Sequence, residues 1–308
     1  EIILDFFKAW QDEKNYIVWA EEAKNLIIYL CPTNVNEKIN ELFFGDRVKL
    51  RKNFHTIFTS ATLTNLVSED LTKAYSYFIQ NTMFPINDSI LSEVKYSPFA
   101  YDKHAKLFYT DDITSPSKDR GKFIDESIDL VKKILDISQG KALILFTSKA
   151  DMNAVYTRLK ALNLNYTLIK QNEISSQQQL IHKFKQDINS VLLGTGVFWE
   201  GISIEGIALS NLIIYKLPFP LPEPIINEKC KRSKNPLEEV LVPEMIIKLK
   251  QGVGRLIRNK TDKGILSIID SRLGDKSKAN YKEKVWQALP IKQRTNSLKE
   301  LQSFYDNL

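Results

Sequence analysis

The chain has 308 residues, of which 43% are hydrophobic and 26% are charged, a composition ordinary for a globular protein with a buried core. Its longest apolar runs, at 142–146 and 211–217, have the length of strands rather than the roughly 20 residues of a membrane helix. We therefore expect a cytoplasmic protein with no membrane span. The formal charge of +6 permits a polyanionic partner such as nucleic acid but does not require one.

The sequence begins at Glu1 without a methionine, a basic leader or a small-residue cleavage site, so we expect a fragment of a longer protein without a signal peptide. Cys31 and Cys230 form no CxxC pair, and the three histidines are scattered along the chain. This spacing predicts neither a metal site nor a disulfide framework.

The first 66 residues predict the end of an α/β domain rather than a whole one. Strand-like runs occupy 15–19, 26–30 and 55–60, and 35–44 is a predicted helix that Asn34 would cap. A helix at 69–80 and a long irregular polar segment at 85–120 follow. We place a domain boundary after residue 66, which separates residues 1–66 from residues 67–308.

From Phe123 onward, predicted helices alternate with short apolar strands. The helices are expected at 123–137, 149–161, 175–186 and 236–258, and the strands at 142–147, 166–170, 190–194, 211–217 and 264–269. Continuous Ile, Leu and Val in such strands predict an α/β fold, with a parallel sheet covered by helices on both faces.

Ligands of such sheets bind beyond the carboxyl ends of the strands. Hydroxyl groups, glycines and charges follow three of the predicted strands, at 146–148, 194–201 and 270–272. Backbone NH groups exposed by glycine, together with Ser and Thr hydroxyls, are the groups that position phosphates. The sequence therefore predicts a phosphate-binding edge of the sheet.

A second phosphate signal lies in the run Gln251-Gly-Val-Gly-Arg-Leu-Ile-Arg258. In a helix, Arg255 and Arg258 are one turn apart. Each guanidinium is a planar, permanently charged fork of donors, and an arginine placed on a transferring phosphoryl group is worth about 10³ to 10⁵ in rate. The alternative is a surface helix with two solvated arginines.

Five segments, in this order, resemble the C-terminal half of superfamily 2 helicases of the DinG/XPD type. They are Ser60-Ala61-Thr62-Leu63 (motif III), 145–148 (motif IV), 194–201 (motif V), the proline-rich 216–224 and 251–258 (motif VI). The resemblance spans residues 16–275. It implies that residues 67–308 are the second RecA-like motor domain and that residues 1–66 are the last strands of the first.

The resemblance also implies residues of the nucleotide site. Arg258 would be the arginine finger on the γ-phosphate of ATP, with Arg255 beside it and Gln251 in the same site. Glu200, Gly201 and Ser203 would line the nucleotide cleft, although family members commonly have Asp in place of Ser203.

DNA binding and coupling of the two motor domains are implied at other positions. Thr147, Ser148 and Thr195 would hold phosphates of single-stranded DNA, and Phe198 and Trp199 would stack on bases unless they pack in the core. Coupling is implied for Ser60, Ala61, Thr62, Asp270 and Arg272. The alternatives are a helix cap at Ser60 and Thr62, and a purely structural ion pair between Asp270 and Arg272.

An ATPase motor also needs a GxxxxGK[ST] phosphate loop and an acidic pair for Mg²⁺. Gly140-Lys141 precedes a predicted strand instead of following one, and Asp125-Glu126 lies within a predicted helix. Both are look-alikes. We expect the fragment alone to be inactive, with ATP and Mg²⁺ used only together with the first motor domain, and we expect no iron–sulfur cluster in it because four cysteines are lacking.

The leading interpretation is the second motor domain of an ATP-dependent DNA helicase, whose partners are ATP, single-stranded DNA and the rest of its own polypeptide. One alternative is a non-unwinding, ATP-responsive DNA-binding module of a DinG-type 3′–5′ exonuclease. Another is an RNA helicase domain, which the proline-rich loop and the wording of motif VI disfavour.

Overall fold

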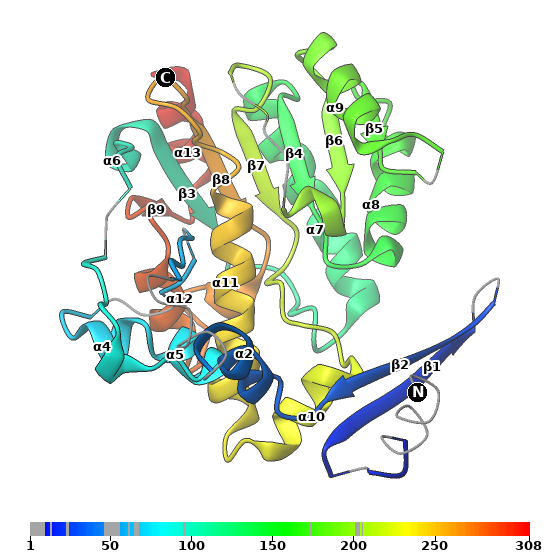
Figure 1. Cartoon of the computed structure of the whole chain (residues 1–308). Coiled ribbons are helices and arrows are strands. Elements are labelled where there is room, and N and C mark those ends of the chain that lie inside the picture. The colour runs from blue at the N-terminus through cyan, green and yellow to red at the C-terminus, as the bar shows by residue number, and fades with distance from the viewer. Residues whose placement is uncertain are drawn as a thin grey trace. The chain divides into compact units, whose positions relative to one another are not determined.

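The computed structural model describes residues 10–12, 14–22, 25–45, 56–60, 62–64, 68–94, 97–172, 174–200, 204 and 206–308. The chain divides into two compact units (Figure 1). The first comprises residues 1–95 and 219–244, and the second comprises residues 96–218 and 245–308. The motor-domain boundary expected after residue 66 stays a prediction.

The first unit contains an antiparallel hairpin of β1 (Tyr16–Glu22) and β2 (Leu26–Pro32). Its helical elements are α2 (Val35–Phe44), α4 (Leu71–Ala74), α5 (Ser76–Thr82), the 3₁₀ turn η1 (Ile86–Asp88), α10 (Pro224–Arg232) and the π-helical η3 (Leu237–Leu241). Phenylalanines of α2 and α5 pack together with Phe58 and Phe84.

Three sequence expectations for this unit need correction. Residues 56–60 are irregular rather than a strand, and His55 lies outside the described residues. The helix expected at 69–80 is broken into α4 and α5. Asn34 stands at the cap position of α2 without a capping hydrogen bond, because its side chain bonds Glu37 and Arg232 instead.

The second unit is built on a seven-stranded parallel sheet in the order β5-β6-β4-β7-β8-β3-β9. The strands are β3 (Ala105–Tyr109), β4 (Ala142–Leu145), β5 (Leu168–Lys170), β6 (Val191–Gly194), β7 (Asn211–Ile214), β8 (Gly264–Ile268) and β9 (Arg294–Thr295). This sheet confirms the predicted α/β class.

The helices of this unit are α6 (Tyr101–His104), α7 (Arg120–Ser138), α8 (Lys149–Ala161), α9 (Gln177–Gln186), α12 (Lys282–Ala288), α13 (Leu298–Asp306) and, from residue 245 onward, α11 (Val242–Val253). Two 3₁₀ turns, η2 (Gly196–Phe198) and η4 (Ser271–Leu273), follow β6 and β8. Side-chain caps start the helices where the sequence offers them: Asp119 caps α7, and Ser176 with Gln179 forms a capping box on α9.

Alternation along the central strands divides the core between two layers. Ile213 and Tyr215 belong to the same buried cluster as the apolar face of α7, whereas Ile214 points toward Gly252 of α11. Since successive strand side chains point to opposite faces, α7 and α11 cover opposite faces of the sheet.

Two differences from the sequence expectations affect this sheet. β3 lies within the segment expected to be irregular, and it pairs with both β8 and β9. The helix expected over 236–258 is the π-helical η3 followed by α11, which ends at Val253. Arg255 and Arg258 are therefore beyond the helix and not one helical turn apart.

Candidate functional site

The carboxyl end of β4 leads into a predicted phosphate contact. Ser148 is the N-cap of α8, and its Oγ accepts a hydrogen bond from the Asp151 N–H at 3.1 Å. A hydroxyl that accepts in this way retains its own hydrogen for a second partner. Thr147 and Ser148 are both half-buried. The structure thus presents a hydroxyl at the amino terminus of a helix, which is a favourable place for an anion.

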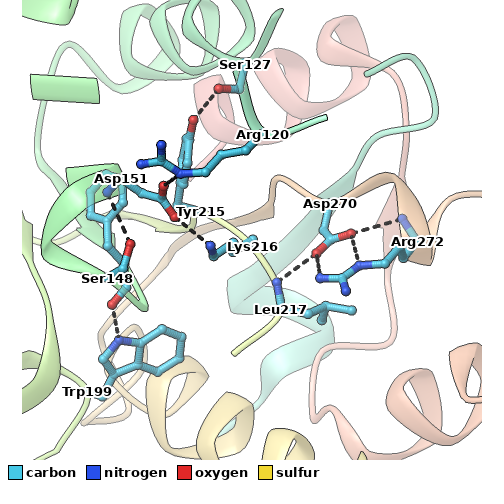
Figure 2. Close-up of polar contacts among 11 residues, drawn as sticks. Arg120, Ser127, Ser148, Asp151, Trp199, Tyr215, Lys216, Leu217, Asp270 and Arg272 are labelled. Carbon is cyan, nitrogen blue, oxygen red and sulfur yellow. Dashed lines mark hydrogen bonds and ion pairs between the residues drawn. The ribbon is translucent and has the colours of Figure 1, made fainter. Parts of the chain in front are cut away.

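A buried carboxylate lies beside Ser148, although sequence reasoning gave it no role. Asp151 is 2% exposed and accepts from Arg120 Nε at 2.7 Å and Lys216 Nζ at 2.5 Å (Figure 2). Burial raises the pKa of Asp151, but bonds to Lys216 and then Arg120 outweigh it and hold the pKa below its usual value. One carboxylate thus binds two cations next to Ser148.

The sequence indicates only part of the cluster formed by Asp151, Arg120 and Lys216. Lys216 opens the proline-rich segment and Asp151 stands in the first turn of a predicted helix, but Arg120 lies outside the quoted motifs. Their meeting depends on β4 and β7 being neighbours in the sheet, since α8 follows β4 and Lys216 follows β7. Strand order was not read from the sequence.

The predicted DNA contact Thr195 faces into the protein. It is buried, and both its N–H and its hydroxyl donate to Gln171 Oε1, at 2.7 and 3.1 Å. Gln171 follows β5, the neighbour of β6, so this bond fixes the beginning of motif V against the next strand. A DNA role for Thr195 stays a prediction.

The base-stacking prediction for Phe198 and Trp199 is wrong, because both side chains are fully buried. A Cβ on Gly194 would collide with the Phe198 ring, and a Cβ on Gly252 would lie 2.8 Å from two atoms of the Trp199 ring. The indole Nε1 of Trp199 donates to the Phe146 carbonyl at 2.8 Å. Core packing, the alternative, is therefore correct.

Motif VI contacts motif V beside the buried Trp199 ring. Arg255 lies in the turn after α11, and its Nε donates to the Trp199 carbonyl at 3.1 Å. Burial lowers the pKa of Arg255 and the charge of Arg258 lowers it further, while Glu200 acts in the opposite direction. The structure thus places Arg255 directly against the backbone of motif V, and Gln251 is half-buried in the last turn of α11.

Asp270 and Arg272 form an ion pair at the carboxyl end of β8. Arg272 Nε and Nη2 bond the two carboxylate oxygens at 2.9 and 2.6 Å, and Asp270 is fully buried (Figure 2). Asp270 also accepts from the Leu217 N–H at 2.9 Å, which ties the chain after β7 to the chain after β8. The structural ion pair is present, and the coupling role stays a prediction.

The remaining site predictions are in part outside the described residues. Ala61, Gly201 and Ser203 cannot be placed for that reason. Ser60 and Thr62 belong to the first unit, where their hydroxyls are 3.1 Å apart and Ser60 Oγ accepts from the Thr62 N–H. These bonds define a local turn and leave the coupling prediction untested.

Both look-alike motifs have structural roles. Gly140 and Lys141 form the turn between α7 and β4, where Gly140 has φ +80° and a side chain would collide with the Asn189 carbonyl. Asp125 lies within α7 and pairs with Arg158 at 2.8 Å. Among the described residues no helix is long and apolar enough to cross a membrane.

Comparisons with known proteins agree on one family. The model described as "Helicase C-terminal domain" matches residues 131–292. The ATP-dependent DNA helicase YoaA of Haemophilus influenzae is 31% identical over 95% of this chain and 43% of its own length. The 3′-5′ exonuclease DinG of Bacillus subtilis is 32% identical over 96% of this chain and 31% of its own.

Solved structures confirm the fold. An apo XPD structure has a TM-score of 0.60 at 19% identity, covering 92% of this chain and 55% of that one. At this identity the likeness concerns the RecA-like architecture alone. The chain spans less than half of the length of these curated relatives.

Proposed function

We propose that this chain, which belongs to the helicase C-terminal domain family, is the second motor domain of an ATP-dependent DNA helicase of the DinG/XPD type. It supplies an arginine finger for ATP hydrolysis and part of a track for single-stranded DNA. The observation that carries the proposal is the arginine pair after α11, with Arg255 bonded to the motif V carbonyl of Trp199.

The residues around this pair suit a polyphosphate. Two guanidinium groups are close enough for Arg258 to lower the pKa of Arg255, so the fold brings like charges together. An anion between them would relieve this repulsion and accept several charge-assisted hydrogen bonds. ATP with Mg²⁺ would supply the transferring phosphoryl group, and Arg258 would stabilise the charge that develops on it.

The rest of the ATP site belongs to the first motor domain in this proposal. The Gly140-Lys141 pair is a turn before β4, and Asp125 is paired on α7, so neither serves as a phosphate loop or an acidic motif. We therefore expect the 308-residue chain alone to bind ATP weakly and not to hydrolyse it.

The DNA track follows from the carboxyl edge of the sheet. Ser148 offers a hydroxyl at the start of α8, and Arg120 and Lys216 place two cations on one carboxylate beside it. A net positive charge next to a helix amino terminus favours the phosphates of a single strand irrespective of its sequence.

The test is the ATPase activity of the full-length protein. Arg258→Ala should lower the DNA-stimulated turnover number by about 10³-fold or more and leave nucleotide affinity within a few-fold, because the finger acts mainly on the transition state. Arg294→Ala is the matched control, since Arg294 packs on the Trp286 ring in the same unit. A loss of tenfold or less for Arg258→Ala would refute the finger assignment.

The relative named 3′-5′ exonuclease DinG supports a second candidate, a DNA-binding module that responds to ATP without unwinding DNA. Strand displacement on a forked duplex separates the two. Unwinding that requires ATP and disappears in Arg258→Ala supports the helicase. Nuclease activity without strand displacement supports the second candidate, and tighter binding to RNA than to single-stranded DNA of equal length would contradict both.

A further inference from the structure

A buried carboxylate holds the backbone at the proposed finger. Asp262 is 6% exposed and lies between the end of α11 and the start of β8. Its Oδ2 accepts from the N–H of Arg258 at 2.8 Å and from the N–H of Asn259 at 3.0 Å. The carboxylate therefore bonds directly to the backbone of the finger residue.

The turn around Asp262 is closed from both sides. Asn259 Oδ1 accepts from the N–H of Asp262 at 2.9 Å, while Asp262 accepts from the N–H of Asn259. Asn259 Oδ1 also accepts from the backbone and hydroxyl of Thr261, at 2.9 and 2.7 Å. Such reciprocal bonds satisfy buried N–H groups and hold the backbone of residues 258–262 in a single conformation.

The second oxygen of Asp262 reaches a different segment. Oδ1 accepts from the N–H of Gly206 at 3.3 Å, and Gly206 has φ +85°, a conformation that favours glycine. Gly206 lies five residues beyond the end of motif V. One carboxylate thus joins the backbone of Gly206 to the backbone of the proposed finger in motif VI.

We propose that Asp262 is a positioning residue for Arg258, one that fixes the finger backbone relative to Gly206. This inference rests on the proposed function of Arg258. Asp262 contacts no reacting atom in this scheme, and it acts through the placement of the Arg258 backbone. Misplacement of a catalytic group by about 1 Å is enough to cost about 10²-fold in rate.

The carboxylate is suited to this role because both oxygens only accept. Three N–H groups point at it, two at one oxygen and one at the other. In Asp262→Asn one oxygen becomes an NH₂ donor, which cannot bond a backbone N–H. That variant can keep either the hydrogen bonds from Arg258 and Asn259 or the hydrogen bond from Gly206, but not both.

The experiment is a double-mutant cycle in the full-length protein, read as DNA-stimulated ATP turnover. Asp262→Ala should lower kcat by about 10- to 100-fold, with the KM for ATP changed by about twofold or less. The same substitution in the Arg258→Ala background should change kcat by less than about twofold, because the group being positioned is already gone. Asp262→Asn should lie between wild type and Asp262→Ala.

A matched variant separates positioning from general loss of stability. Ser127→Ala removes the buried 2.6 Å hydrogen bond between the hydroxyls of Ser127 and Tyr215. Ser127 is on α7, which covers the face of the sheet opposite to α11. This substitution should lower the melting temperature without lowering kcat. If Asp262→Ala does not fold, Asp262→Asn carries the cycle, with an expected loss of about 3- to 10-fold.

The outcomes are distinct. Equal losses for the Asp262 substitution in the wild-type and Arg258→Ala backgrounds would overturn the positioning role while leaving the finger in place. A kcat loss no larger than that of Ser127→Ala would overturn it as well. Unchanged turnover in Arg258→Ala alone would overturn the proposed function, and this inference with it.

Discussion

The two glycines of motif VI allow a matched test of how motif V packs on it. A Cβ added at Gly252 would lie 2.8 Å from Cε3 and Cζ3 of Trp199 and 3.4 Å from Ile214. Trp199 is fully buried and held by its bond to the Phe146 carbonyl, so the ring has no open direction in which to move. A Cβ at Gly254 would meet two carbonyl oxygens at 3.4 and 3.5 Å, which is ordinary contact.

The expected cost of Gly252→Ala follows from these distances. Overpacking a filled core costs about 1–3 kcal/mol, and the better helix propensity of Ala returns up to about 1 kcal/mol. Gly254→Ala needs no repacking and should stabilise by about 0.4–1 kcal/mol through the unfolded chain. Taking the midpoints of these ranges, the two variants should differ by about 2 kcal/mol, with Gly252→Ala the less stable.

Thermal denaturation of the chain measures this difference. For a unit of this size, 1 kcal/mol corresponds to roughly 2–4 °C, so the melting temperatures should differ by roughly 4–8 °C. In a Trp199→Leu background, where the opposing ring is absent, Gly252→Ala should cost less than it does in the wild-type chain. A Gly254→Ala variant that melts at or below Gly252→Ala would refute the packing argument.

Two further predictions concern the carboxyl edge of the sheet. Ser148→Asp should keep the N-cap of α8 and therefore leave the melting temperature unchanged. It should weaken the binding of single-stranded DNA by about 1 kcal/mol or more, because the new carboxylate repels phosphate. An unchanged affinity would show that Ser148 does not contact DNA. Asp151 has a lowered pKa in the folded state, so its carboxylate stabilises the fold above the unfolded pKa of about 3.9, and this contribution is lost as the pH falls through the folded pKa. Asp151→Asn should therefore lower the free energy of unfolding, measured in urea, by about 2–3 kcal/mol at pH 7 and by progressively less below pH ~4. An equal loss at pH 7 and below pH ~4 would contradict the charge argument.

The local sequence pattern was sufficient to predict those helices and strands that are regular along their length. The helices over 35–44 and 149–161 have the bounds expected from the sequence. The central strands are continuous Ile, Leu and Val, which is the pattern of a sheet buried on both faces. Motif order then identified the family without any knowledge of strand order.

The missed elements depend on partners distant in the sequence. β3 carries Lys106 and Tyr109 in a polar neighbourhood, and its partners β8 and β9 lie far along the chain. Likewise α11 ends early because the backbone N–H groups beyond it bond elsewhere, that of Arg258 to Asp262. Trp199 was open to either interpretation, since its burial depends on the lack of a side chain at Gly252.

The proposed DNA contacts and the backbone of Arg258 lie at opposite ends of parallel strands. Ser148 and Thr195 follow the carboxyl ends of β4 and β6, whereas Asp262, which holds Arg258, precedes the amino end of β8. Between these ends, Trp199 packs on Gly252 and its carbonyl accepts from Arg255, and Gly206 donates to Asp262. A displacement of motif V at the DNA end would therefore act on the finger through a buried aromatic contact and through backbone hydrogen bonds, both of which resist small deformations. In this chain, the contact requires a large buried side chain at Trp199 and a residue without a side chain opposite it at Gly252.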